Sequence, residues 1–167
     1  MTIQISCLPV FINLIVATPA PTSSNENITD DEKKTFVSFS KTKRLAAQEG
    51  AEAKKMIKDD SGLAGYEGEI SIYGYFENIL GRQKNKEEIF KDLVAGFNVS
   101  RKSAREKIVI FRSLKDGDPS KEKALVENYR YLGQLGAYAE LLKEFAKAYP
   151  EFKDKLPKNL PIPLTAP

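Results

Sequence analysis

Apolar side chains recur every three or four positions over most of this sequence, and that spacing constrains the fold more than any other feature. Between residues 70 and 81 they fall on one side of a helix, and a second set keeps the same period between residues 86 and 97. The members of the two stripes are Ile72, Tyr73, Phe76, Ile79 and Leu80, and then Ile89, Phe90, Leu93, Val94 and Phe97. Such stripes are typical of amphipathic helices that bury one side against their neighbours, so the sequence predicts a helical bundle.

Capping residues and glycines divide the first half of the chain into helices. Thr29 and Glu32 have the spacing of a capping box, which predicts a helix start near residue 30, and Gly62 is expected to end that helix. The glycine-rich stretch 61–69 is predicted to be a turn. Asn85 is the predicted N-cap of the helix that carries the second stripe.

Two further helices are predicted after residue 97. Ser100 is the expected cap of the first, and Pro119 begins the last at a position where the missing N–H of proline costs nothing. This last helix runs to Tyr149, and over residues 132–149 its apolar side chains keep a seven-residue period. The period predicts a short seam that either packs inside the bundle or forms a dimer, and its small length favours the inside.

The predicted fold class is therefore all-α, a bundle of about five helices with an extended, proline-rich C-terminal tail. The bundle domain covers residues 29–150, a polar linker covers 21–28, and the tail covers 151–167. The tail is expected to be extended or disordered, or to lie as a strap across the bundle.

Composition argues against an enzyme. The chain has no histidine, and its one cysteine is Cys7, so neither a catalytic triad nor a thiolate metal cluster can be built. The acidic residues that could form a catalytic pair stand in charged runs typical of solvated helix ends: Asp30, Asp31, Asp59, Asp60, Glu87 and Glu88. No glycine-rich phosphate loop follows a strand. We expect no catalytic residues, no cofactor and no metal.

The first twenty residues resemble a secretory signal peptide. An apolar run from Ile3 to Ala17 is followed by small residues that a signal peptidase could cleave near Ala20, and it is too short and interrupted to span a membrane. The alternative is an apolar arm packed on the domain. Asn27 and Asn98 each begin a glycosylation sequon, which agrees with a secreted or otherwise extracytoplasmic protein.

The stretch "GFNVSRKSAREKI", residues 96–108, offers a different interpretation. Together with the helix before it, the stretch resembles the helix-turn-helix of bacterial transcriptional repressors, with a turn at Asn98 and Val99. The resemblance implies that Ser100, Arg101, Lys102, Ser103 and Arg105 face DNA. Residues 99–115 hold six basic residues and one acidic residue, a clustering that suits a phosphate backbone.

These observations leave open more than one function. We expect a non-enzymatic, exported helical protein that binds a protein partner or an apolar small ligand held between its helices. The residues expected to line such an interior are Tyr73, Phe76, Phe90, Phe97, Phe111 and Phe145. The alternatives are a cytoplasmic DNA-binding regulator and a subunit of a larger assembly.

Overall fold

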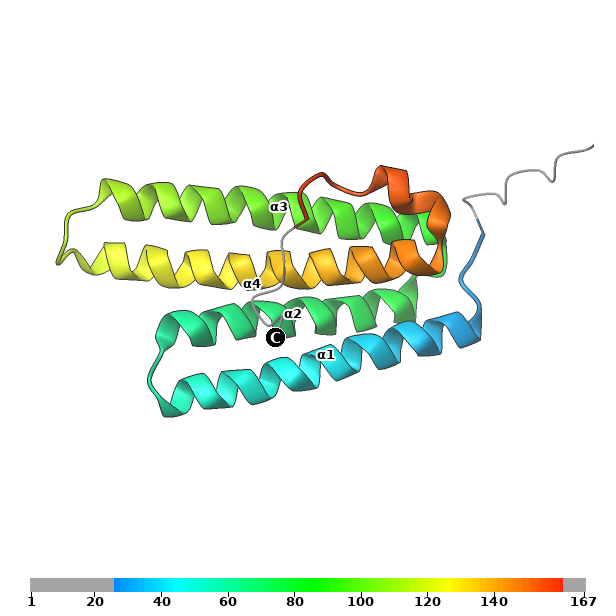
Figure 1. The fold of residues 1–167 in the computed structure, drawn as a ribbon, viewed down its shortest axis with the longest axis horizontal. Coiled ribbons are helices and arrows are strands. Elements are labelled where there is room, and N and C mark those ends of the chain that lie inside the picture. Colours follow the sequence, from blue (N-terminus) through cyan, green and yellow to red (C-terminus); the bar gives the residue numbers. More distant parts are fainter. Residues whose placement is uncertain (1–25, 161–167) are drawn as a thin grey trace, which may run out of the picture.

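A computed structural model describes residues 26–160, which fold as a bundle of helices without a strand in that range. In chain order the elements are α1 (Asp30–Met56), α2 (Asp60–Arg82), α3 (Lys86–Ser113), α4 (Pro119–Ala148) and the 3₁₀ helix η1 (Pro150–Lys155) (Figure 1). The all-α bundle that the sequence predicts is confirmed. None of the helices within this range has the length and hydropathy that crossing a bilayer requires.

The four long helices lie side by side in the order α3, α4, α2, α1 (Figure 1). Each of the pairs α1–α2 and α3–α4 is an antiparallel hairpin, and α2 packs against α4 to join the two hairpins. As a result α4 and α2 are the inner helices, and α3 and α1 form opposite edges of the molecule.

Helices α1, α3 and α4 begin where their capping residues predict. The hydroxyl oxygen of Thr29 accepts a hydrogen bond from the backbone N–H of Glu32, whose carboxylate accepts one from the N–H of Thr29. The side-chain oxygen of Asn85 accepts a hydrogen bond from the N–H of Glu88 at 3.0 Å. Asp118 caps α4, with Pro119 in its first turn. These predicted helix starts are confirmed.

The glycine-rich stretch 61–69 is helical, so the turn predicted there is wrong. It belongs to α2, and its glycines allow α2 and α4 to cross in backbone contact. A Cβ added to Gly133 would overlap the carbonyl oxygen of Gly65, and a Cβ added to Gly68 would overlap a backbone carbonyl of α4. Each glycine costs a helix about 1 kcal/mol relative to alanine, and the close crossing offsets that cost.

Helix α3 is continuous through residues 96–108, so the predicted turn at Asn98 and Val99 is also wrong. Ser100 does not cap a helix. It is buried between α3 and α4, where its hydroxyl donates a hydrogen bond to the side-chain oxygen of Gln134 at 3.0 Å. The helix-turn-helix geometry is therefore not formed by this segment.

A continuous buried stripe explains why α3 does not break. Leu93, Phe97, Ser100 and Ala104 are all buried, at spacings of four, three and four residues. This is an unbroken helical period, with a serine in an apolar series. Because Ser100 is polar, the apolar spacing in the sequence breaks off after Phe97, although the buried stripe continues.

The C-terminal residues return to the bundle after α4. Residues 150–155 form η1, whose Phe152 is fully buried, and Leu156 and Leu160 pack against the core. The described residues of the tail, up to Leu160, therefore contact the bundle, and residues 150–155 are helical and not extended. Residues 161–167 of the predicted tail lie outside the described residues.

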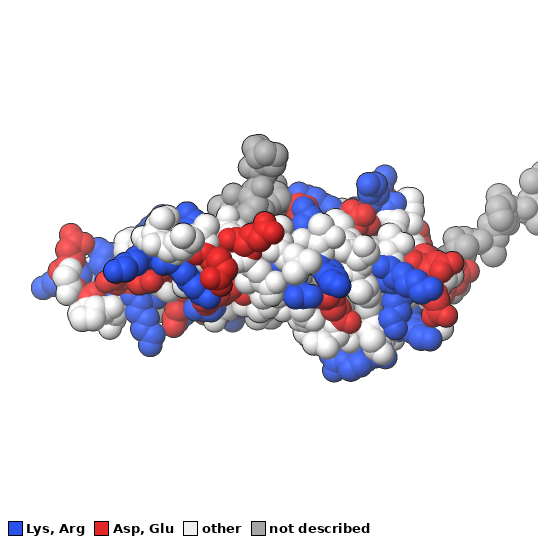
Figure 2. Space-filling view, turned by 90° about the horizontal axis from the view of Figure 1, so that it is seen from below, with Lys and Arg blue, Asp and Glu red and all other residues white. Residues whose placement is uncertain are grey.

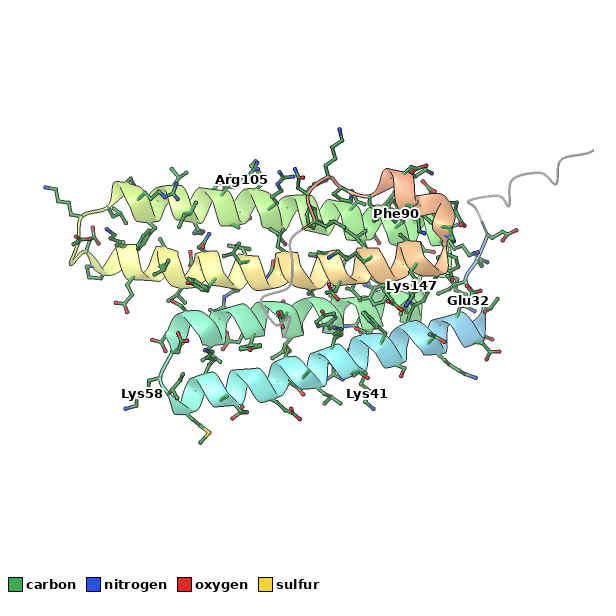
Figure 3. All side chains as sticks on the ribbon, in the orientation of Figure 1. Glu32, Lys41, Lys58, Phe90, Arg105 and Lys147 are labelled. Carbon is green, nitrogen blue, oxygen red and sulfur yellow. The ribbon has the colours of Figure 1, made fainter. Side chains whose placement is uncertain are left out.

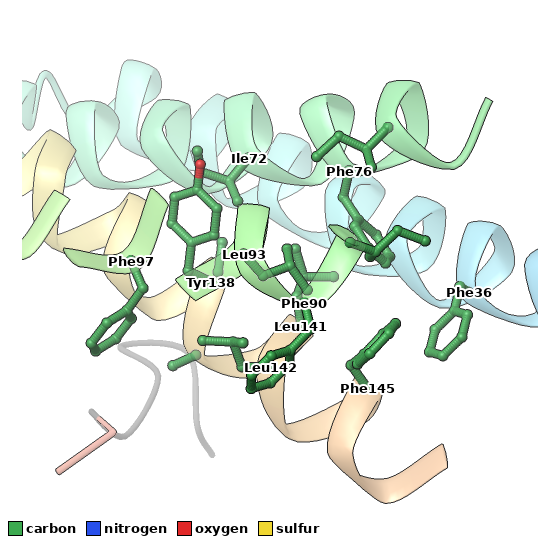
Figure 4. Packing of buried hydrophobic residues seen from close by; sticks show 14 of the residues in the cluster. Phe36, Ile72, Phe76, Phe90, Leu93, Phe97, Tyr138, Leu141, Leu142 and Phe145 are labelled. Carbon is green, nitrogen blue, oxygen red and sulfur yellow. The ribbon is translucent and has the colours of Figure 1, made fainter. Parts of the chain in front are cut away.

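The aromatic core lies at the end of the bundle where α1 begins and α4 ends (Figure 4). The rings of Phe36 and Phe145 stack with centroids 5.6 Å apart, and those of Phe90 and Phe152 are 4.6 Å apart. The apolar seam of residues 132–149 also points inward: all of its members except Leu132 are buried within the chain. A dimer through this seam would have to displace these contacts.

Candidate functional site

Within residues 26–160, the candidate sites are the outer face of α3 and a cavity between α2 and α4. We define the outer face of α3 by the residues that share the side of the helix turned away from α4: Val99, Lys102, Arg105, Glu106, Val109 and Ile110. Helix α3 is an edge helix, and Arg105 projects outward from it (Figure 3).

The outer face of α3 mixes cations with exposed aliphatic side chains. Val99, Val109 and Ile110 are 64%, 63% and 41% exposed. Lys102 and Arg105 lie among them, and Lys102 pairs with Glu106 at 4.0 Å. By contrast, the α1 side of the molecule carries basic and acidic side chains interspersed (Figure 2).

The residues predicted to face DNA do not share one surface. Arg101 and Ser103 are partly exposed, Lys102 and Arg105 are exposed, and Ser100 is buried against α4. Four of the five therefore reach the surface along one continuous helix. They lie in the middle of α3 and not in the first turn of a helix, where a recognition helix makes its base contacts.

The aromatic residues predicted to line an apolar ligand site are core residues with one exception. Tyr73, Phe76, Phe90, Phe97 and Phe145 are buried and belong to one hydrophobic cluster. Their rings and those of their neighbours occupy the volume in which the ligand was expected (Figure 4). The exception, Phe111, is half-buried near the end of α3, where the ammonium of Lys121 lies 4.9 Å from its ring centroid.

Both predicted glycosylation sites are exposed. Asn27 lies just before α1 and forms an isolated bridge with Asn85, and Asn98 lies in the middle of α3. Glycosylation at either asparagine stays a prediction.

A cavity of about 260 Å³ opens between the α1–α2 turn and α4, and sequence reasoning missed it. We name it the Glu69 cavity. Its lining comes from three helices and the turn: Lys54, Asp59, Ser61, Gly62, Gly65, Tyr66, Glu69 and Tyr129. The two glycines leave room beside the α2 backbone, so the stretch misread as a turn forms one wall.

Glu69 is the unusual member of this lining. Its side chain lies within α2 and is only 7% exposed. Burial raises the pKa of its carboxyl to about 7; Lys43 opposes this shift and Glu140 adds to it. The ammonium of Lys43 lies 3.7 Å from Glu140, so Glu140 competes for the cation that acts on Glu69. A sequence pattern does not distinguish Glu69 from the exposed acids, because its burial depends on how closely α2 approaches α4.

Residues 26–160 contain no group of three or more histidine, cysteine, aspartate or glutamate side chains placed to hold a metal ion. No protein-family model, no curated protein and no solved structure significantly matches this chain, so its function has to be argued from the two regions described above.

Proposed function

We propose that this protein is a non-enzymatic binding protein whose outer face of α3 docks an acidic segment of a protein partner. The observation that carries the proposal is the exposure of Val99, Val109 and Ile110 among cationic side chains. Burying apolar area releases about 25 cal/mol per Å². Burying these three side chains against a partner would therefore contribute favourably to binding.

The length and charge of the face indicate the kind of partner. Val99 and Ile110 are eleven residues apart, which corresponds to about 17 Å along a helix at 1.5 Å per residue. This is the length of a short helix. Lys102 and Arg105 flank the aliphatic side chains, so an amphipathic helix with an apolar stripe bordered by Asp or Glu would complement both features.

DNA is the alternative partner, and the aliphatic side chains disfavour it. Arg101, Lys102 and Arg105 could contact phosphates, but Val99 and Val109 would then lie against a highly charged backbone that offers no apolar surface to bury them. A protein surface accommodates both kinds of side chain. The same mixture would also suit an anionic membrane, which the experiment has to distinguish.

The test uses designed ligands, because the partner is unknown. A fluorescent three-turn helical peptide with a leucine stripe bordered by glutamates is titrated with the full chain, alongside a peptide of the same composition in scrambled order. We expect the patterned peptide to bind more tightly, and Val109→Asp or Arg105→Glu to weaken it by about tenfold or more. Lys41→Glu, a charge reversal at an exposed site on α1 (Figure 3), is the matched control and should not change binding.

Four results would overturn the proposal. Equal binding of both peptides would remove its basis, as would unchanged binding by Val109→Asp. Preferential binding to duplex DNA, with affinity that falls steeply as salt rises, would favour the regulator. Preferential binding to vesicles containing phosphatidylserine would assign the face to a membrane surface.

Export is the second element of this proposal, and it rests on the apolar run before Ala20, which lies outside the described residues. The described contacts begin at Glu26, whose carbonyl accepts a hydrogen bond from the N–H of Lys86 at 3.1 Å. Cleavage near Ala20 would therefore leave every described contact in place. The intact mass of the protein from its native cells tests export: loss of about twenty residues is expected, and a full-length mass would contradict it.

A further inference from the structure

The Glu69 cavity brings a buried carboxyl group to an opening that is partly walled by aromatic side chains. Tyr66 and Glu69 come from α2, and Tyr129 comes from α4. The cavity lies between the α1–α2 turn and α4 and shares no residue with the outer face of α3. It is therefore independent of the function proposed above. We infer that the Glu69 cavity binds small organic ammonium ions, with the carboxylate of Glu69 as their counter-ion.

The cation of the lining, Lys54, is paired with another carboxylate, and Lys43, the cation that acts on Glu69 from outside the lining, also pairs with Glu140. At the mouth of the cavity, the ammonium of Lys54 lies 3.2 Å from the carboxylate of Asp59, so these two neutralise one another. Asp59 also accepts a hydrogen bond at 2.9 Å from the N–H of Gly62. Among the described residues, none donates a hydrogen bond to the carboxylate of Glu69, a residue that is 7% exposed. A buried carboxylate in this situation attracts a cation that carries its own apolar body.

The aromatic residues suit an ammonium group. A cation positioned over the face of a tyrosine ring is attracted by the negative face of that ring, and aromatic cages bind quaternary ammonium ions in this way. Tyr66 lies against the α1 backbone, since a Cβ on Gly50 would collide with its ring. Tyr129 is 36% exposed and lies on the α4 side of the cavity.

Size and donor chemistry narrow the ligand class further. The cavity of about 260 Å³ is slightly smaller than the ~300–1,000 Å³ of sites for drug-sized ligands. It therefore suits a molecule with few heavy atoms. A hard divalent cation would need about six oxygen ligands, several of them carboxylates, whereas the carboxylates of the lining are those of Glu69 and of Asp59, which is already paired.

The groups that face Glu69 come from each helix packed around it. They are Lys43 from α1, Tyr73 from α2 and Glu140 from α4. Burial raises the pKa of Tyr73 far above its usual value, with contributions from Glu69 and Glu140, so Tyr73 stays neutral. Glu69 is thus the group whose ionisation changes near neutral pH. A cation should bind more tightly as the pH rises.

The experiment compares choline with its neutral isostere, 3,3-dimethylbutan-1-ol, by NMR titration of the full chain. We expect choline to shift the resonances of the cavity residues, and the alcohol to bind at least about tenfold more weakly at pH 8. With a pKa of about 7, Glu69 is roughly one-tenth ionised at pH 6 and nine-tenths ionised at pH 8. The affinity for choline should therefore rise about tenfold between these values.

Matched variants identify the residues responsible. Glu69→Gln should abolish choline binding, and Glu67→Gln, the same change on the same helix at a residue paired with Arg130 at 2.8 Å, should leave it unchanged. Tyr129→Leu should weaken it about two- to fivefold. Circular dichroism establishes that each variant is folded. Equal affinity for choline and the alcohol, binding by Glu69→Gln, or no detectable choline binding at pH 8 would each overturn the inference.

Discussion

The buried carboxyl of Glu69 predicts that Glu69→Gln stabilises the fold at neutral and alkaline pH and leaves its stability unchanged at acid pH. Burial raises the pKa of this carboxyl from 4.5 to about 7. A tenfold change in the acid dissociation constant corresponds to about 1.4 kcal/mol, so ionising Glu69 in the folded chain costs about 3 kcal/mol more than in the unfolded chain. Glutamine has nearly the same shape and cannot ionise, so the variant avoids this cost.

The direction of the pH dependence follows from the raised pKa. Well below pH 4.5 Glu69 is protonated in both the folded and the unfolded chain, and its ionisation costs the fold nothing. As the pH rises towards 7, the unfolded chain loses the proton first and the wild-type protein becomes less stable. The difference between variant and wild type should therefore grow between pH 4.5 and about pH 7 and then remain constant.

Urea denaturation of both proteins at several pH values between 4 and 8.5 measures this difference. At pH 8 we expect the free energy of unfolding to be about 3 kcal/mol higher for the variant, or a Tm roughly 6–12 °C higher. Carboxylates whose pKa is lowered, such as those of Glu127 and Asp116, titrate equally in both proteins and cancel in the difference. Glu67→Gln is the control and should show no such trend. A difference that does not change with pH would refute the reasoning.

Two other predictions concern the packing of the bundle and are measured by thermal or urea unfolding. Gly133→Ala should destabilise the fold by several kcal/mol, because its Cβ would overlap the carbonyl oxygen of Gly65. Gly136→Ala is the matched control: its Cβ meets no atom within 4 Å, so the change should stabilise α4 by up to about 1 kcal/mol. Equal effects of the two changes would contradict the close crossing of α2 and α4. Phe152→Ala should cost about 3–5 kcal/mol, because the ring is fully buried against Phe90, and a negligible loss would mean that η1 is not docked.

Local chemistry in the sequence predicted most of the helix starts, and long-range contacts decided where that reasoning failed. The caps at Thr29 and Asn85 depend on hydrogen bonds three residues away, so they can be recognised from the sequence. The glycines of α2 act through contact with α4, which no local pattern reveals. Ser100 is inward-facing because Gln134, thirty-four residues later, accepts its hydrogen bond. A serine cap and a buried serine have the same local sequence.

The candidate regions were predicted to different extents for the same reason. The cations around Arg105 are on the surface, where a charge pattern in the sequence corresponds to a charge pattern in space. The Glu69 cavity requires α1, α2 and α4 together, and its glutamate stands in a sequence full of exposed acids. The sequence around residue 69 does not indicate that Glu69 is buried. Its burial follows from the contact of Gly65 and Gly68 with α4, which only the structure shows.

Glu69 and the core residues have opposite effects on the stability of the fold. A core residue such as Phe145 stabilises the fold, and its presence is explained by packing alone. Glu69 does the opposite above pH 4.5, since its carboxylate is desolvated and Lys43, the cation that acts on it, also pairs with Glu140. An ammonium ion bound beside Glu69 would reduce that penalty, so the same desolvation that destabilises the fold would contribute to the affinity for the ion. Binding should accordingly raise the Tm of the wild-type protein at pH 8, and it should leave the Tm of Glu69→Gln unchanged.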